Sequence, residues 1–264
     1  MKRILAMSRS LLIRQALIVT VFLILGANGY GQTTPAARQL LDSMIKALGG
    51  QQFVDVKEIQ TTGRFFVFNK GEISQSDLYA NYWKIPDMDR IEFGKDKTKP
   101  VRVDINHGFE GWRLTQPAKG KDLDVAKQSE AEIDEFLKGF RTSFNYVMRF
   151  VVNAPKATLV NAGSTTVDTK RADILEIRDA QKNLMRVYID RETRYPLKVQ
   201  TRLTDEQFTD EWLYANWHEF DGVMTPLLVV RYRDGVKLQE TRVETVAYNP
   251  GFPDSLFAPP SKAK

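Results

Sequence analysis

The chain has 264 residues, with 38 Lys and Arg against 33 Asp and Glu and no cysteine. The absence of cysteine excludes disulfide bonds and thiol chemistry. The positive excess comes from the N-terminus, because 34 basic and 33 acidic residues remain when residues 1–31 are set aside. A net charge this close to zero gives no dense basic face for nucleic acid, so we expect no nucleic-acid partner.

Residues 1–31 have the three-part pattern of a secretory signal peptide. Basic residues without any acidic residue precede a continuous apolar run at 16–27. Gly29 and Gly31 then place small residues at the −3 and −1 positions of a cleavage site, so we expect cleavage before Gln32.

An uncleaved membrane anchor is the alternative interpretation of this segment. A spanning helix needs about 20 apolar residues, and Arg14 and Gln15 limit the run to about a dozen. We therefore expect a periplasmic domain over 32–264 with no stable membrane span after cleavage. Because no cysteine follows the run, lipid anchoring at a processed N-terminus is excluded.

An amphipathic helix is expected to open this domain. Thr34 can cap it, Pro35 suits its first turn, and Gly49 with Gly50 favours a helix end. Apolar residues recur at the spacing of one helix face, at Ala37, Leu40, Leu41, Met44, Ile45 and Leu48. This face must pack on an apolar surface.

After Val56 the pattern is typical of strands. Asn69-Lys70-Gly71 predicts a hairpin turn, and proline and glycine punctuate the strands that follow. The strands expected in this half are residues 57–68, 72–83, 88–93, 101–105 and 109–114.

A second amphipathic helix is expected at about residues 130–152. Its apolar stripe consists of Ile133, Phe136, Leu137, Phe140, Phe144, Val147, Met148 and Val151. Strands then resume at 157–160, 171–177, 184–189, 197–203, 208–220, 225–232 and 236–246. In the proline-rich tail, we expect Phe252, Leu256 and Phe257 to contact the sheet.

These elements predict an α+β, mostly β fold. Its expected architecture is a single curved antiparallel sheet, an open half-barrel, with two to three helices covering the concave face. A long antiparallel sheet twists and curls, which leaves a concave interior under the helices. The pattern does not decide whether that interior is a filled core or an open pocket.

Five segments also carry a family resemblance: 47–50, 77–93, 106–112, 187–198 and 220–226, with the chain closing at 257–259. In their order along the chain they resemble the LolA/LolB family of periplasmic lipoprotein carriers. The resemblance implies a half-barrel of about eleven strands with a helical lid and a cavity for acyl chains. Ile85 departs from it, because the carriers have there an arginine that is tied to lid closure and cargo release.

Catalytic and metal-binding patterns are weak. His107 and His218 have no partner at metal-ligand spacing, and we expect structural roles for both. The pairs Asp87/Asp89 and Asp122/Asp124 are expected to be solvated carboxylates in turns. We therefore expect no enzyme, no cofactor and no metal site.

Large aromatic and apolar side chains are the candidate ligand-binding residues. On the strand over 208–220, Trp212 and Tyr214 are expected on one face and Trp217 on the other. Such side chains are ordinarily core; the alternative is that they line a cavity for acyl chains. The candidates are Trp83, Trp112, Trp212, Phe136, Phe140, Phe144 and Met148.

Two functions remain open on these grounds. The first is a non-catalytic periplasmic binder or carrier of lipid or lipidated protein, whose partners are acyl chains. The second is a regulatory or scaffolding envelope domain of the same fold that binds a protein partner and no lipid.

Overall fold

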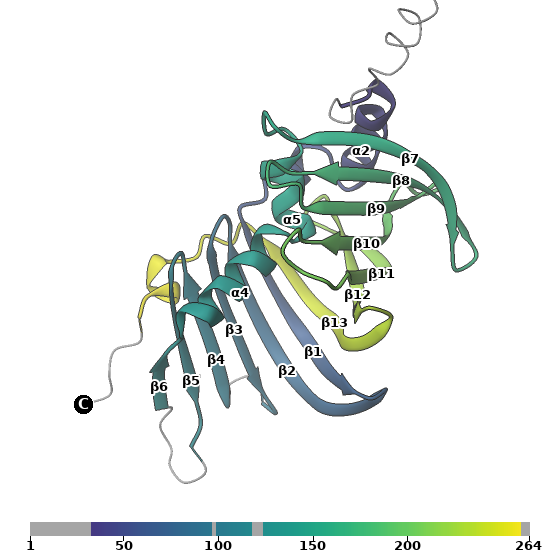
Figure 1. Cartoon of the computed structure of the whole chain (residues 1–264). Coiled ribbons are helices and arrows are strands. Elements are labelled where there is room, and N and C mark those ends of the chain that lie inside the picture. Colours follow the sequence, from purple (N-terminus) through teal and green to yellow (C-terminus); the bar gives the residue numbers. More distant parts are fainter. Residues whose placement is uncertain (1–32, 97–98, 118–123, 260–264) are drawn as a thin grey trace, which may run out of the picture. The chain divides into compact units, whose positions relative to one another are not determined.

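The computed structural model describes residues 33–96, 99–117 and 124–259. The predicted signal peptide lies outside them. The described strands form one antiparallel sheet of 13 strands, in the order β6-β5-β4-β3-β2-β1-β13-β12-β11-β10-β9-β8-β7 (Figure 1). The sheet is open, with β6 and β7 at its edges, and it curves strongly (Figure 1). The expected open curved sheet is confirmed.

Strands that follow each other in the chain lie side by side in the sheet, except β6 and β7, which form its two edges. The pairing of β1 with β13 joins the first and last strands of the domain. The first half of the sheet is β1 Glu58–Asn69, β2 Glu72–Lys84, β3 Met88–Gly94, β4 Arg102–His107, β5 Glu110–Thr115 and β6 Asp124–Lys127. The second half is β7 Thr158–Val167, β8 Lys170–Arg178, β9 Leu184–Asp190, β10 Pro196–Arg202, β11 Asp210–Phe220, β12 Val223–Arg233 and β13 Val236–Tyr248. The sequence did not predict β6, and β7 is longer than expected.

The helices of the described residues fall into three groups. The first consists of α2 Pro35–Ala47 and α3 Gln51–Val54, and the second of α4 Glu130–Arg141, α5 Phe144–Tyr146 and the π-helical turn η1 Val147–Val151. The third is the 3₁₀ turn η2 Asp254–Phe257. No helix within the described ranges is long and apolar enough to span a membrane.

Helix α2 has the predicted caps. Thr34 Oγ1 accepts from Ala37 N, and Pro35 occupies the first turn. Gly49 ends the element with a φ of +124° and approaches β12 so closely that an added Cβ would lie 2.3 Å from the carbonyl oxygen of Gly222. Glycine is therefore required there for its conformation and for the lack of a side chain.

The expectation of a single helix over 130–152 is wrong. Helix α4 ends at Arg141, and Ser143 begins a new element because its Oγ accepts from Tyr146 N at 3.2 Å. Thr142 Oγ1 instead donates to the carbonyl oxygen of Lys138 at 2.7 Å. Two adjacent hydroxyl residues thus break the helix, although the apolar stripe runs across the break.

A partly buried arginine fixes the segment after this break. The Arg149 guanidinium donates to the carbonyl oxygens of Phe53, Val56 and Asn145 at 2.6, 3.0 and 2.9 Å. It also lies 4.4 Å from the ring centroid of Phe53. Burial lowers its pKa to about 10. These bonds tie η1 to the segment between α2 and β1.

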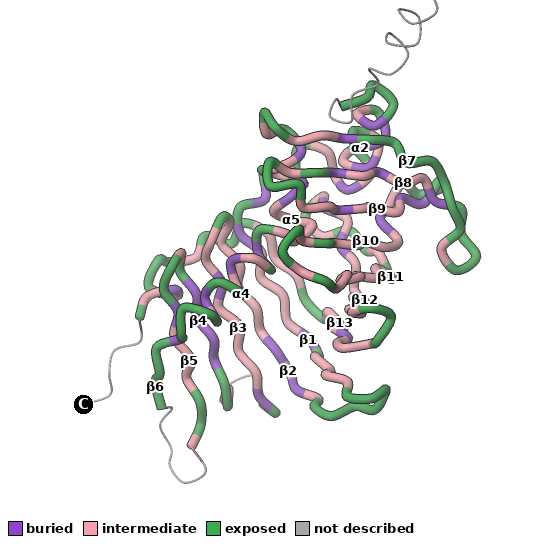
Figure 2. Tube along the Cα trace, in the orientation of Figure 1, coloured by how far each residue is buried: buried purple, intermediate pink, exposed green. Residues whose placement is uncertain are grey.

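The main hydrophobic core lies between α2, η1 and the β7–β10 part of the sheet. It contains Leu40, Leu41, Met44, Met148, Leu159, Leu175, Ile177, Val187 and Ile189. Along β8 and β9 buried residues recur at nearly every second position, as in a sheet packed on one face. Most residues of β1 and β11 are only partly buried (Figure 2).

The C-terminal tail covers part of the sheet beside β3 and β4. Phe257 is fully buried, and Arg90 donates to the carbonyl oxygen of Leu256 at 3.4 Å. The ring of Phe252 contacts Tyr82 and Phe257. The expected contact of this tail with the sheet is confirmed.

Candidate functional site

The concave face of the sheet holds a half-open cavity of about 650 Å³ below α4 and α5. Its walls are built by α4, α5 and residues from β1–β5 and β10–β13. Cavities of about 300 to 1,000 Å³ accommodate small-molecule ligands. The interior is thus a filled core under α2 and an open space under α4, which answers the question that the sequence left open.

In the lining of the cavity, aromatic side chains of the helices contact those of the sheet. The rings of Trp83 on β2 and Phe140 on α4 have centroids 4.8 Å apart, and those of Phe144 and Tyr214 are 6.2 Å apart. Phe136 lies 5.4 Å from Phe140 along α4. Aliphatic residues complete this part of the lining, including Leu48, Ile59, Ile91, Val199, Val229 and Val243.

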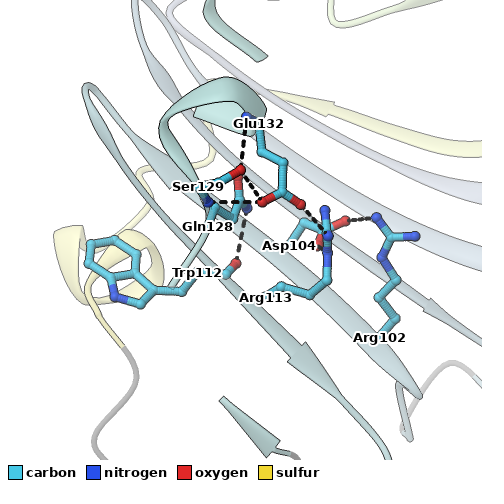
Figure 3. Close-up of polar contacts among 7 residues, drawn as sticks. All are labelled: Arg102, Asp104, Trp112, Arg113, Gln128, Ser129 and Glu132. Carbon is cyan, nitrogen blue, oxygen red and sulfur yellow. Dashed lines mark hydrogen bonds and ion pairs between the residues drawn. The ribbon is translucent and has the colours of Figure 1, made fainter. Parts of the chain in front are cut away.

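Five of the seven candidate binding residues line the cavity: Trp83, Trp212, Phe136, Phe140 and Phe144. Met148 and Trp112 do not. Met148 is 1% exposed and belongs to the core beside α2. Trp112 turns to the opposite face of β5 from Arg113, which lines the cavity (Figure 3).

Trp217 lines the cavity together with Trp212 and Tyr214, so the expectation that it faces the other side is wrong. Asn216 has a left-handed backbone, with a φ of +56°. Strict alternation of side chains requires extended residues throughout, and this one interrupts it. The rings of Tyr214 and Trp217 consequently lie 6.2 Å apart.

One end of the cavity is polar, which the sequence did not reveal. Two rows of paired residues cross β2 to β5 on the cavity side of the sheet. The first row is Trp83, Asp89, Asn106 and Gly111, and the second is Asn81, Ile91, Asp104 and Arg113. Four strands therefore bring together polar side chains that lie far apart in the sequence.

A salt-bridge network joins the second row to α4 (Figure 3). Arg113 donates to Asp104 and to Glu132, both at 2.6 Å, and Arg102 donates to Asp104 at 2.5 Å. Glu132 also accepts from the backbone N–H of Ser129 in a capping box. That backbone bond, the Ser129 hydroxyl and Arg113 lower the pKa of Glu132 to about 2. The network fastens the start of α4 to β5.

Asp89 lies in the first row and is 7% exposed. Its carboxylate accepts from Asn81 Nδ2 at 2.6 Å. Burial and, to a lesser degree, the negative charge of Asp104 raise the pKa of Asp89 to about 7, although hydrogen bonds from Asn81 and Trp83 act in the opposite direction. The expectation that this carboxylate is solvated in a turn is wrong.

Three buried side-chain atoms have no hydrogen-bond partner within the described ranges: Asn106 Oδ1, Trp217 Nε1 and Arg231 Nε. All three residues line the cavity. Buried polar groups in proteins are normally paired, since an unpaired one costs about 1–3 kcal/mol. The unpaired polar atoms therefore concentrate where a ligand or water could pair with them.

The remaining candidate residues lie elsewhere. His107 and His218 are both exposed, and Asp124 is exposed at the edge strand β6, whereas Asp122 lies outside the described residues. No group of three or more His, Cys, Asp or Glu side chains that could hold a metal ion occurs in the part of the chain that the structure describes.

Ile85, where the chain departs from the carrier family, does not line the cavity either. The neighbouring Lys84 pairs instead with Glu58 at 3.5 Å and with Asp254 of the C-terminal turn at 2.8 Å. This region of β2 therefore holds the tail of the chain.

No family model and no curated protein matches this sequence. Solved structures do resemble the fold. A DUF1329 family protein from Desulfovibrio piger aligns with a TM-score of 0.57 and 14% identity, over 85% of this chain and 98% of that one. A putative outer membrane lipoprotein-sorting protein domain from Vibrio parahaemolyticus aligns with a TM-score of 0.55 and 13% identity, over 84% and 97%.

A LolA superfamily protein from Nitrosomonas europaea is also similar, with a TM-score of 0.52 and 10% identity over 84% of this chain and 97% of that chain. At these identities the likeness concerns the fold, and it extends over most of each chain.

Proposed function

From the premise that this chain has a LolA/LolB-like fold, we propose that it binds an acyl chain of a lipid or lipidated protein below α4 and α5. In this role it carries that cargo within the cell envelope without catalysis. The observation that supports the proposal most directly is the cavity of about 650 Å³ with its aromatic lining. An apolar chain that enters it leaves water, which stabilises the complex by about 25 cal/mol per Å² of buried apolar surface.

Helix α4 is suited to act as a lid over this cavity. It presents Phe136 and Phe140 to the interior. Its attachments to the sheet include the pair of Glu132 with Arg113 and the pair of Lys138 with Asp205, at 2.6 and 3.0 Å. Exposed ion pairs contribute little, about 0–1 kcal/mol each. The break after Arg141 separates α4 from the segment that Arg149 fixes, and in the proposed role α4 would be displaced without that segment.

Acyl binding is tested with the purified protein and a fluorescent fatty acid that a lipid displaces. We expect Phe140→Asp to weaken binding by at least about tenfold, because it places a charge in the apolar part of the cavity. The matched control is Phe150→Asp on η1, where the ring is 46% exposed, and it should leave affinity unchanged.

The same preparation is extracted with organic solvent and analysed by mass spectrometry for co-purified lipid. No lipid in the extract and no binding of the probe would contradict the proposal. A protein partner that stays bound after delipidation would then favour the regulatory or scaffolding role.

We further propose that residues 1–31 direct export and that the domain over 32–264 acts in the periplasm. The supporting observation is the charge and apolar pattern of this segment. Intact-mass measurement of the protein from a periplasmic extract should give a chain that begins at Gln32. A mass that retains the segment would indicate an uncleaved anchor.

A further inference from the structure

Asp89 differs from the other buried carboxylates of the described residues. Six Asp and Glu side chains are buried there, and five of them pair with a lysine or arginine. Those pairs are Glu58 with Lys84, Asp77 with Lys95, Asp104 with Arg102 and Arg113, Asp190 with Lys170, and Glu240 with Lys237 and Arg242. Asp89 instead has two neutral donors, the amide of Asn81 and the side chain of Trp83.

The neighbours of Asp89 in the cavity add further acceptors. Asn106 pairs with Asp89 across β3 and β4, is 5% exposed, and its Oδ1 is unpaired. Asp104 lies in the adjacent row and adds negative charge. Its charge is shared with Arg102 and Arg113, which leaves Asp89 as the carboxyl without a cation.

At this end of the cavity, Gly111 lets the side chains of Asn106 and Gln128 approach the backbone of β5. A Cβ at this position would lie 2.9 Å from Asn106 Oδ1 and 2.8 Å from the side chain of Gln128. Distances below 3.0 Å exclude a side chain without movement of these two amides. The row therefore ends against two amide side chains rather than in apolar packing.

We propose that this polar end holds the protonated amino group of an amphiphile whose alkyl chain lies among the aromatic residues. The inference rests on the proposed function, because it specifies the ligand of the same cavity. An ammonium group brings the positive charge that Asp89 lacks and three N–H donors for Asp89 and Asn106. An anionic head group would instead meet Asp89 and Asp104 in a buried site, where like charges repel strongly.

An alternative partner for an anionic head group is Arg231, the charged residue among the three described ones with an unpaired buried atom. Arg231 lies on β12, and three strands separate it from β3. Its Nη2 already donates to Asp210 at 2.9 Å. The affinity of a ligand whose head group binds at Arg231 would not depend on Asp89.

The test compares dodecylamine, dodecanol and dodecanoate, which share the alkyl chain and differ in the charge of the head group. Each displaces the fluorescent fatty acid from the full-length purified protein near neutral pH, below its micellar concentration. We expect dodecylamine to bind about tenfold more tightly than dodecanol, as for a hydrogen bond to a charged group, and dodecanoate to bind most weakly.

The variant Asp89→Asn should abolish the preference for dodecylamine over dodecanol. Asp77→Asn, which removes a buried carboxylate outside the cavity lining, should keep the preference. Equal binding of all three by the wild-type protein, or preference for dodecanoate, would overturn the inference and leave the acyl-binding function standing. If none of the three binds, both the inference and the proposed function fail. The wild-type series decides the matter even if Asp89→Asn does not fold.

Discussion

At the scale of single residues, Asp89 is the most unusual side chain described. A buried carboxyl without a cation costs folding free energy when it is ionised. Its pKa of about 7 means that the folded protein holds this proton to a much higher pH than the unfolded chain, whose value is 3.8. Folding therefore loses stability as the pH rises from about 4 to about 7.

We expect Asp89→Asn to remove this dependence. The variant should be about 1–4 kcal/mol more stable than the wild-type protein at pH 8, and this difference should shrink as the pH falls towards 4. Urea unfolding at several pH values measures it. A difference that stays constant with pH would show that the carboxyl of Asp89 is not buried as described.

Asp77→Asn is the matched control, and its effect on the free energy of unfolding should change with pH in the opposite direction. Burial raises the pKa of Asp77, but hydrogen bonds from Lys95 and Gln75 and the charge of Lys95 outweigh it, so the pKa is lowered overall. Its stabilising effect is present above the unfolded value and is lost on acidification. This variant should therefore lose stability at neutral pH and lose less in acid.

At the scale of elements, Arg149 holds α5 and η1 while α4 is fastened near the surface. Replacement of Arg149 by leucine would leave the carbonyl oxygens of Phe53, Val56 and Asn145 without their donors. We expect a loss of about 2–4 kcal/mol in the free energy of unfolding. Arg186→Leu removes a partly exposed pair with Glu176, which keeps Arg178 as a partner, and should change it by less than about 1 kcal/mol. Equal effects in urea unfolding would argue against a special role for Arg149.

Element type was more predictable from the sequence than element ends. The caps and apolar face of α2 are local signals, so its position was predicted closely. The break between α4 and α5 was missed because Phe140 and Phe144 continue the apolar stripe across Thr142 and Ser143. These hydroxyl residues were the available signal.

The aromatic part of the cavity was partly predictable, because Phe136, Phe140 and Phe144 follow from helical spacing. The polar end was not. Asp89 follows Pro86 and Asp87 and thus looks like a turn residue, and its neighbours Asn106 and Asn81 come from other strands. Cross-strand register depends on long-range pairing, so a single sequence does not assemble this row.

At the scale of the whole domain, the meander of strands explains how a filled core and a cavity coexist in one sheet. The pairing of β1 with β13 joins two halves: α2 packs tightly on one, and α4 bridges the concave side of the other (Figure 1). Helices α2 and α4 are of similar length, 13 and 12 residues, so helix length does not explain the difference: α2 packs on the main core, whereas α4 lines the cavity.

Quenching of tryptophan fluorescence by a brominated fatty acid tests most directly whether an acyl chain occupies this cavity. Trp83, Trp212 and Trp217 line it, whereas Trp112 faces the other side of the sheet. We predict saturable quenching that falls when Trp83 is replaced by phenylalanine and is unchanged in Trp112→Phe. Quenching that depends on Trp112 alone, or no saturable quenching, would contradict an acyl-binding cavity below α4.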